Sequence, residues 1–250
     1  FPAFHRHELR SEILGENREI YVRVPRGYQE STDPYSVLYV LDAEWHMLQA
    51  VAVVEQHTEC GYIQSHSAPP MVVVGVVNVD RNRDYTPTHA PQQHRMAFPT
   101  SGQADRFLDF LEKELIPHID RNYRTYPHRI IAGWSFGGLL ATHALIHRPE
   151  IFDAYLAISP SLWWDEELLL AEADSLAAAG ETRSQTLVMT IGTGEEGGLC
   201  YEAVKAFLRR REAAPLQGLD LRHIEIPGES HNYTPLKAYA DGIPSLFADW

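Results

Sequence analysis

Six short runs of apolar residues, separated by segments with helical periodicity, constrain the fold of this chain more than any other feature. A run that is apolar at nearly every position is buried on both faces, as strands of a parallel sheet between two helical layers are. The runs are Ser36 to Leu41 (SVLYVL), Met71 to Val77 (MVVVGVV), Arg129 to Ala132 (RIIA), Ala154 to Ile158 (AYLAI), Thr186 to Ile191 (TLVMTI) and Leu221 to Ile226 (LRHIEI).

Segments with apolar residues three and four positions apart alternate with these runs, and such spacing predicts helices. They are Glu44 to Glu55, Ala104 to Ile119, Gly138 to Ile146 and Glu202 to Arg211. The N-terminal part differs, because Phe4 to Leu9 and Glu19 to Val24 alternate as antiparallel strands do. The sequence therefore predicts an α/β fold with a mostly parallel, doubly wound sheet, antiparallel N-terminal strands and a site at the carboxyl ends of the strands.

The length and composition suit one large core. A chain of 250 residues with 44% hydrophobic content can bury about three quarters of its unfolded surface, so we expect a single domain over residues 1–250. Two stretches are longer than ordinary connections, Asn78 to Gln103 and Ser161 to Ser184. Both follow predicted parallel strands, so we expect them to form the walls of a substrate cleft.

The charge excludes some classes of partner. A formal net charge of -13 disfavours binding to nucleic acid or to an anionic membrane surface, because both need a basic face. No apolar run approaches the roughly 20 residues of a membrane-spanning helix. The segment FPAFHRHEL has no features of a secretory signal, which leaves the compartment open between cytoplasm, periplasm and secretion. Cys60 and Cys200 could form a disulfide or be two buried thiols.

The segment Gly133-Trp134-Ser135-Phe136-Gly137-Gly138 lies between the strand RIIA and the helical LLATHALIH. A Gly-x-Ser-x-Gly pattern at a strand-to-helix turn indicates a nucleophile elbow, in which small neighbours allow the serine to take a strained conformation. Ser135 is therefore the candidate nucleophile. The backbone N–H of Phe136, at the start of the helix, is a candidate oxyanion donor.

The candidate base and acid follow from chain order, which in such sheets is serine, acid, histidine. His231 follows the last predicted strand and the turn Pro227 to Ser230, whereas His223 falls within that strand. The strand TLVMTI leads directly to Glu195 and Glu196. We favour Glu195 as the acid that orients His231, with Glu196 as the alternative.

At these motifs the chain resembles the putative-esterase branch of the α/β-hydrolases, which includes trilactone siderophore (enterobactin-type) esterases, S-formylglutathione hydrolases and feruloyl esterase domains. The resemblance covers most of the chain and is strongest with the siderophore-esterase-like members. It rests on Tyr39-Val40-Leu41-Asp42-Ala43, the stretch NVDRNRDYTP from Asn78 to Pro87, the elbow GWSFGG and Ser159-Pro160-Ser161-Leu162-Trp163-Trp164.

The resemblance implies further site residues. The second oxyanion donor maps to the backbone N–H of Glu44, although Ala43 replaces the usual glycine before it. Arg81 and Arg83 fall in the substrate-side loop of the family, where an arginine could bind a carboxylate or catecholate and could equally hold the loop by an internal ion pair. Trp163 and Trp164 could stack on the substrate or belong to the core. No metal or organic cofactor is implied.

The sequence therefore predicts a serine carboxylic ester hydrolase for a small-molecule ester, of siderophore type or another small carboxylic ester. A feruloyl-type esterase, a thioesterase and an acyltransferase share the same apparatus. A metal-dependent hydrolase is disfavoured because the 13 histidines include no HExxH or comparable ligand spacing. A catalytically silent binding module remains an alternative, because a fold alone does not guarantee activity.

Overall fold

A computed structural model describes residues 4–59 and 68–248 of the protein. Its strands form one sheet in the order β1-β2-β4-β3-β5-β6-β7-β8. The strands are β1 (His5–Ser11), β2 (Glu16–Arg23), β3 (Tyr35–Val40), β4 (Met71–Val76), β5 (Thr125–Trp134), β6 (Ala154–Ile158), β7 (Thr186–Gly192) and β8 (Asp220–Ile226).

The pairing confirms the fold class that the apolar runs predict. β1 pairs with β2 and β2 with β4 in antiparallel register, and the six strands from β3 to β8 are parallel to one another. The residues of β3, β4 and β6 are all buried, as strands covered on both faces must be. The first two strands alternate because one face of this edge is open to solvent.

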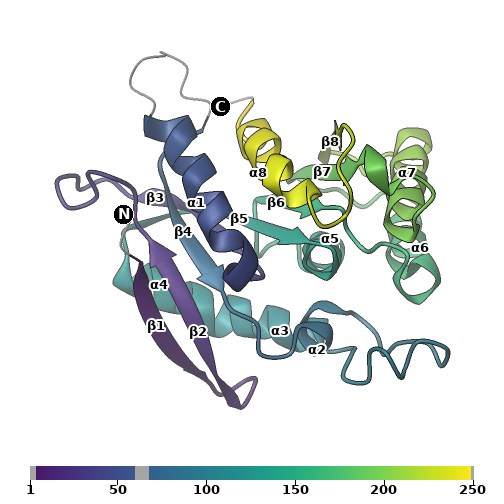
Figure 1. Ribbon diagram of the computed structural model, residues 1–250, viewed down its shortest axis with the longest axis horizontal. Coiled ribbons are helices and arrows are strands. Elements are labelled where there is room, and N and C mark those ends of the chain that lie inside the picture. Colours follow the sequence, from purple (N-terminus) through teal and green to yellow (C-terminus); the bar gives the residue numbers. More distant parts are fainter. Residues whose placement is uncertain (1–3, 60–67, 249–250) are drawn as a thin grey trace.

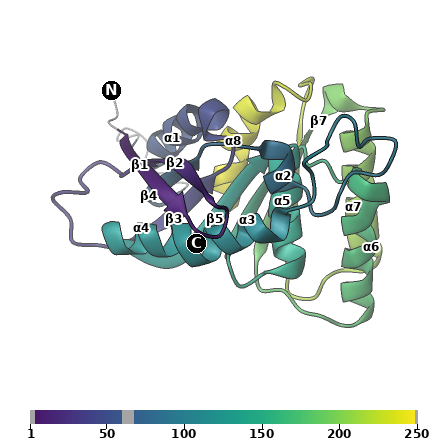
Figure 2. The same cartoon turned by 90° about the horizontal axis from the view of Figure 1, so that it is seen from below.

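Helices cover both faces of the sheet, as Figures 1 and 2 show. They are α1 (Ala43–Glu59), α2 (Arg81–Tyr85), α3 (Ala104–Phe110), a π-helical turn (Leu111–Leu115), α4 (Ile116–Asn122), α5 (Phe136–His147), α6 (Trp164–Ala178), a short 3-10 turn (Thr193–Glu195), α7 (Leu199–Ala213) and α8 (Thr234–Ser245).

Two hydrophobic clusters lie on opposite faces of the sheet, because successive strand residues point to opposite sides. Val37 and Tyr39 of β3 belong to the cluster that packs on α3, α5, α6 and α7. Leu38 and Val40 belong to the cluster that packs on α1 and α8. The central strands are therefore buried between two helical layers.

The strand order reverses between β3 and β5, which are hydrogen-bonded neighbours. After β3 the chain passes into α1 on one face, and after β5 it passes into α5 on the other. A crevice opens at such a switch point, beyond the carboxyl ends of the two strands. The fold thus places the ends of β3 and β5, which carry Asp42 and Ser135, side by side.

Two connections differ from the expectation. The stretch from Ser161 to Ser184 is mostly the helix α6, which packs against α5 and α7, rather than an irregular wall of the cleft. Its first turn has positive φ at Asp165, Glu166 and Glu167, so the helical period is broken near its start.

The sequence analysis also missed α8, which contacts α1 across one face of the sheet. The predicted loop from Asn78 to Gln103 contains only the short helix α2.

A buried ion-pair network fastens α2 to the second strand. Arg18 of β2 and Asp84 of α2 are each 1% exposed, and Arg18 Nη2 lies 2.5 Å from Asp84 Oδ2. Arg83 contacts Asp84 on one side and Glu16 on the other. A buried charge is tolerated only when it is paired and hydrogen-bonded, so the four residues stabilise one another.

We expect Asp84→Ala to lower the free energy of unfolding by about 3 kcal/mol, because it leaves the Arg18 guanidinium buried with fewer partners. Chemical denaturation measured by circular dichroism checks the value. Lys113→Met is the matched control, since the Lys113–Asp109 pair is exposed and exposed pairs contribute less than about 1 kcal/mol. Equal effects of the two substitutions would contradict the importance of the buried network.

Candidate active site

Ser135 lies at a sharp turn between β5 and α5, with φ 56 and ψ -113. This conformation is strained for a residue with a side chain. A Cβ atom on Gly133 would lie 2.4 Å from the backbone of Gly137, so only glycine allows the strand and the helix to approach so closely. The elbow predicted from the Gly-x-Ser-x-Gly pattern is present, and it projects the Ser135 side chain from the end of the strand.

Ser135, His231 and Glu195 form a continuous hydrogen-bonded series. His231 Nε2 lies 3.0 Å from Ser135 Oγ, and His231 Nδ1 lies 2.7 Å from Glu195 Oε2. The carboxylate can only accept, so Nδ1 donates to it and Nε2 of the neutral ring accepts from the serine hydroxyl. This geometry suits His231 to remove the hydroxyl proton of Ser135.

Glu195, and not Glu196, is the carboxylate that contacts His231. The Glu195 side chain is 5% exposed, whereas Glu196 is exposed to solvent. Its second oxygen, Oε1, accepts hydrogen bonds from Ser159 Oγ at 2.6 Å, from Thr234 Oγ1 at 3.0 Å and from the backbone N–H of Gly192 at 3.1 Å. Both oxygens are thus fixed in position.

Burial alone would raise the pKa of Glu195, because a desolvated carboxylate resists ionisation. Hydrogen bonds from His231, Ser159 and Gly192, together with the charge of the histidine, outweigh that effect and leave the pKa below its ordinary value. Glu195 is therefore ionised at neutral pH and can stabilise a protonated His231.

The first turns of α5 and α1 supply the candidate oxyanion donors, the N–H groups of Phe136 and Glu44. The N–H groups of a first helical turn have no intrahelical acceptor. The two helix starts are adjacent, because a Cβ on Gly137 would lie 3.3 Å from Asp42 Oδ2. The positive φ of this loop falls at Asp42 (φ 55) and not at Ala43, so the alanine is compatible with the turn.

Arg81 is fixed beneath the nucleophile turn rather than free in the cleft. Its Nε lies 2.7 Å and its Nη2 3.0 Å from the two oxygens of Asp42, and Nη2 also donates to the carbonyl oxygen of Trp134 at 2.9 Å. The guanidinium carbon lies 5.5 Å from the ring centroids of Trp134 and Phe136. Arg81 therefore ties the three loops at the ends of β3, β4 and β5 together.

The other predicted substrate contacts separate into two groups. Trp163 is half-buried and lines a pocket of about 620 Å³ beside the triad, together with Leu199, Cys200 and Tyr201. Trp164 is 1% exposed and donates its indole N–H to Thr88, so it packs in the core and supports the ring of Phe136. Arg83 is held in the ion-pair network of Glu16 and Asp84, as the alternative interpretation of that loop anticipated.

Several residues of the site were missed by the sequence analysis. Ser161 Oγ lies 3.1 Å from Ser135 Oγ, and Ser159 and Thr234 hold Glu195. Ser159 and Ser161 stand in the motif that carries the family resemblance, so their spacing at a strand end was a usable signal. Thr234 begins α8, a helix that the sequence analysis did not predict. The possible pairing of Cys200 with Cys60 lies outside the described residues.

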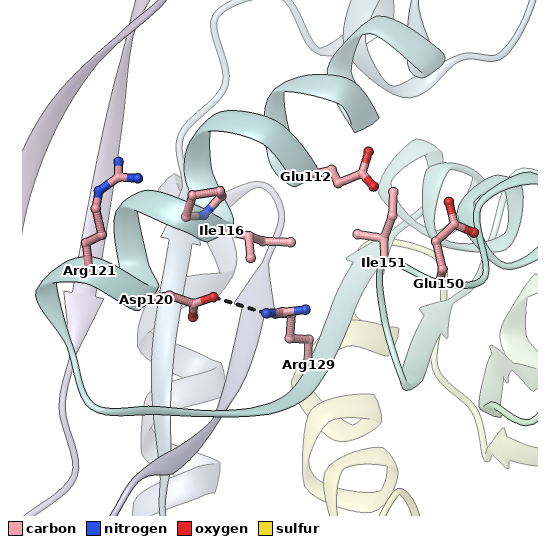
Figure 3. A pocket seen from close by; sticks show the side chains of 8 residues that line it. Glu112, Ile116, Asp120, Arg121, Arg129, Glu150 and Ile151 are labelled. Carbon is pink, nitrogen blue, oxygen red and sulfur yellow. Dashed lines mark hydrogen bonds and ion pairs between the residues drawn. The ribbon is translucent and has the colours of Figure 1, made fainter.

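A second pocket, of about 430 Å³, is lined by residues of the π-helical turn, α4, β5 and the loop after α5 (Figure 3). Its charged side chains include Asp120 and Arg129, which form an ion pair 3.0 Å long. Arg129 is near the amino end of β5, whereas the triad lies at the carboxyl ends of the strands. This pocket is therefore separate from the site of chemistry.

Serine hydrolases are the class of enzyme in which a strained serine, a histidine and a buried carboxylate meet at such a turn. Within the described residues, no helix is long and apolar enough to cross a lipid bilayer. The comparisons with known proteins agree with the class.

The chain belongs to the family described as "Putative esterase", whose model matches residues 11–248. It is 27% identical over 241 residues to the ferri-bacillibactin esterase BesA of Bacillus subtilis, covering 86% of this chain and 80% of that protein. It is 27% identical over 253 residues to a siderophore triacetylfusarinine C esterase of Aspergillus fumigatus, covering 89% and 85%. A crystal structure of an IroE-like serine hydrolase from Shewanella oneidensis matches with a TM-score of 0.89, 31% identity and coverage of 99% and 81%. The protein is a serine ester hydrolase of this family.

The lowered pKa of Glu195 predicts how its contribution to stability depends on pH. A depressed carboxyl pKa stabilises the folded state above the ordinary glutamate value of about 4.3, and that contribution is lost as the pH falls through the folded pKa. We expect Glu195→Gln to lower the free energy of unfolding by about 2 kcal/mol at neutral pH, and this effect should shrink progressively as the pH falls below about 4.3. Denaturant titrations at a series of pH values check this.

Glu196→Gln is the matched control for this measurement. Glu196 is the next residue along the chain, and its side chain is exposed. Removing its charge should therefore change stability little at every pH. A Glu195→Gln effect that does not change between neutral and acidic pH would contradict the ionisation of Glu195 in the folded protein.

Proposed function

We propose that the enzyme, a single α/β-hydrolase domain, cleaves carboxylic esters through an acyl-enzyme on Ser135, with small siderophore-type esters as its substrate class. The observation that carries the mechanism is the unbroken hydrogen-bond series from Ser135 Oγ through His231 to Glu195. The substrate class is supported by the two relatives named as a ferri-bacillibactin esterase and a siderophore triacetylfusarinine C esterase, which align with most of this chain.

In the first half of the reaction, His231 Nε2 takes the hydroxyl proton as Ser135 Oγ attacks the ester carbonyl carbon. Glu195 stabilises the imidazolium and holds its orientation. The negative charge that develops on the carbonyl oxygen is stabilised by the N–H groups of Phe136 and Glu44 at two helix N-termini. His231 then protonates the leaving alcohol, and the acyl group remains on Ser135.

In the second half, water attacks the acyl-enzyme with His231 again as base, which releases the acid and restores the serine. The pocket beside the triad lies against Glu195 and His231 and has an aromatic and aliphatic wall formed by Trp163, Leu199 and Tyr201. We assign the binding of an apolar part of the substrate to this wall. Arg81 does not bind the substrate itself. It holds the loop that carries the N–H group of Glu44 in place through its two hydrogen bonds to Asp42.

The charge of the protein favours weakly charged esters over polyanionic ones. The chain carries a formal net charge of -13, and the positive charge of Arg81 is matched by the buried carboxylate of Asp42. A polyanionic ester is therefore repelled during its approach, whereas a neutral ester is not.

We expect Ser135→Ala to reduce kcat/KM for a short-chain p-nitrophenyl ester at least about a thousandfold, because no other group replaces the attacking oxygen. The assay compares identically purified proteins with a chelator present. Ser161→Ala, which removes the hydroxyl 3.1 Å away, should change kcat/KM by no more than about tenfold. Equal activity of Ser135→Ala and wild type would disprove the mechanism and favour a binding module or a narrower substrate.

The repulsion predicts a salt effect that depends on the substrate. For an ester bearing several negative charges, kcat/KM should rise with added salt, since ions screen charges beyond about 10 Å at 0.1 M ionic strength. For a neutral ester of similar size it should stay nearly constant. A fall in kcat/KM with salt for the anionic ester would indicate instead a locally positive cleft that attracts it.

A further inference from the structure

Cys200, the second residue of α7, lies beside the catalytic series but takes no part in the mechanism described above. Its side chain is half-buried, and its Sγ lies 3.8 Å from the hydroxyl of Ser161, which in turn contacts Ser135. Burial raises the pKa of the Cys200 thiol, so without a further partner it stays protonated at neutral pH.

Cys200 forms a three-residue cluster with Glu195 and His231. One carboxylate oxygen, one ring nitrogen and the sulfur all lie within 4.8 Å of one another. Among residues 4–59 and 68–248, this is the one group of three or more histidine, cysteine and acidic side chains with that proximity. The three come from separate parts of the chain, the turn after β7, the start of α7 and the loop after β8.

The chemistry of the three groups selects a borderline-soft dication. Zn²⁺ binds thiolate sulfur, imidazole nitrogen and carboxylate oxygen, and three protein ligands leave a fourth tetrahedral position open to water. Mg²⁺ and Ca²⁺ prefer six or more oxygen ligands and would not select a thiolate. One thiolate and one carboxylate neutralise the charge of Zn²⁺, so the complex of the ion with its three ligands is neutral, as a partly buried site favours.

The cluster is accessible from solvent. All three residues line the pocket of about 620 Å³ beside the triad, so a cation in this pocket lies next to the cluster. The carboxylate of Glu195 gives up one of its present hydrogen bonds when it binds the ion. The formal net charge of -13 also raises the local concentration of cations at the surface.

We propose that Glu195, Cys200 and His231 form an inhibitory Zn²⁺ site that shuts off the esterase. Binding releases the thiol proton of Cys200 to solvent and forms the Zn–S bond. If the metal takes Nε2 of His231, it occupies the lone pair that accepts the proton of Ser135. If it takes Nδ1, the ring proton moves from Nδ1 to Nε2, which then donates a hydrogen bond and no longer accepts the proton of Ser135. Either bond removes the general base, while Ser135 itself remains unmodified.

The binding test uses Ser135→Ala protein, in which the proposed ligands are intact and turnover plays no part. Titration with Co²⁺, under a non-thiol reductant, should produce an ultraviolet thiolate-to-metal charge-transfer band that Zn²⁺ abolishes by displacement. Adding Cys200→Ser should remove the band and weaken Zn²⁺ binding, measured by calorimetry, at least about tenfold. Adding Cys60→Ser, the other cysteine of the chain, should leave both unchanged.

The activity test uses the enzyme with Ser135 present and expresses each rate relative to the metal-free rate of the same variant. Zn²⁺ should inhibit the wild type reversibly, and a chelator should restore it, whereas Cys200→Ser should need at least about tenfold more Zn²⁺ for the same inhibition. Glu196→Gln is the control for the loss of a charged side chain in the pocket, and Zn²⁺ should inhibit this variant at the same concentration as the wild type.

Two results would overturn the site. A Co²⁺ spectrum without the thiolate band in the Ser135→Ala protein excludes Cys200 as a ligand, whatever the enzyme hydrolyses. Equal Zn²⁺ inhibition of wild type and Cys200→Ser shows that any inhibitory metal binds elsewhere. Because the binding test needs no substrate, failure of the metal site is distinguishable from failure of the proposed ester hydrolysis.

Discussion

The close contact of β5 with α5 at the nucleophile turn is the constraint on which the rest of the site depends. Glycine at positions 133 and 137 lets the strand and the helix meet, and Ser135 between them takes a positive φ. Two other non-glycine residues with positive φ, Asp42 and Ser159, lie just past the ends of β3 and β6, the strands on either side of β5. Such conformations cost about 1–3 kcal/mol each, so surrounding contacts must hold them.

Those contacts are the polar groups of the site. Arg81 and Asn78 donate to the carboxylate of Asp42, and the hydroxyl of Ser159 donates to Glu195. These charge-assisted hydrogen bonds offset the backbone strain at Asp42 and Ser159. They also hold the candidate oxyanion loop after β3 and the carboxylate of Glu195 in position. The same bonds that stabilise the fold in this region therefore also fix the positions of the proposed catalytic groups.

Particular elements show how far the sequence was informative. The apolar runs predicted all six strands of the parallel part. Burial on both faces explains the pattern in β3, β4, β6 and β7, whereas β8 at the sheet edge is only partly buried. The pattern for Ser135 was equally local, since the glycines that permit the turn are two positions away. In contrast, α6 was not recognised as a helix, although its buried Leu169, Leu170 and Ala173 have helical spacing. Trp164 and Arg83 were grouped with their neighbours Trp163 and Arg81, although adjacent residues of a turn or helix face different surroundings.

By itself, the sequence determined the α/β class, the strand–serine–helix turn and the histidine that follows the last strand, because each depends on residues that are close along the chain. Only the tertiary structure decided that Glu195 rather than Glu196 meets His231, that Arg81 is bound by Asp42, and that Cys200 lies beside both triad partners. The contacts of His231 and of Arg81 join segments that are tens of residues apart, and their geometry depends on the order of the strands in the sheet and on the packing of side chains between its helical layers.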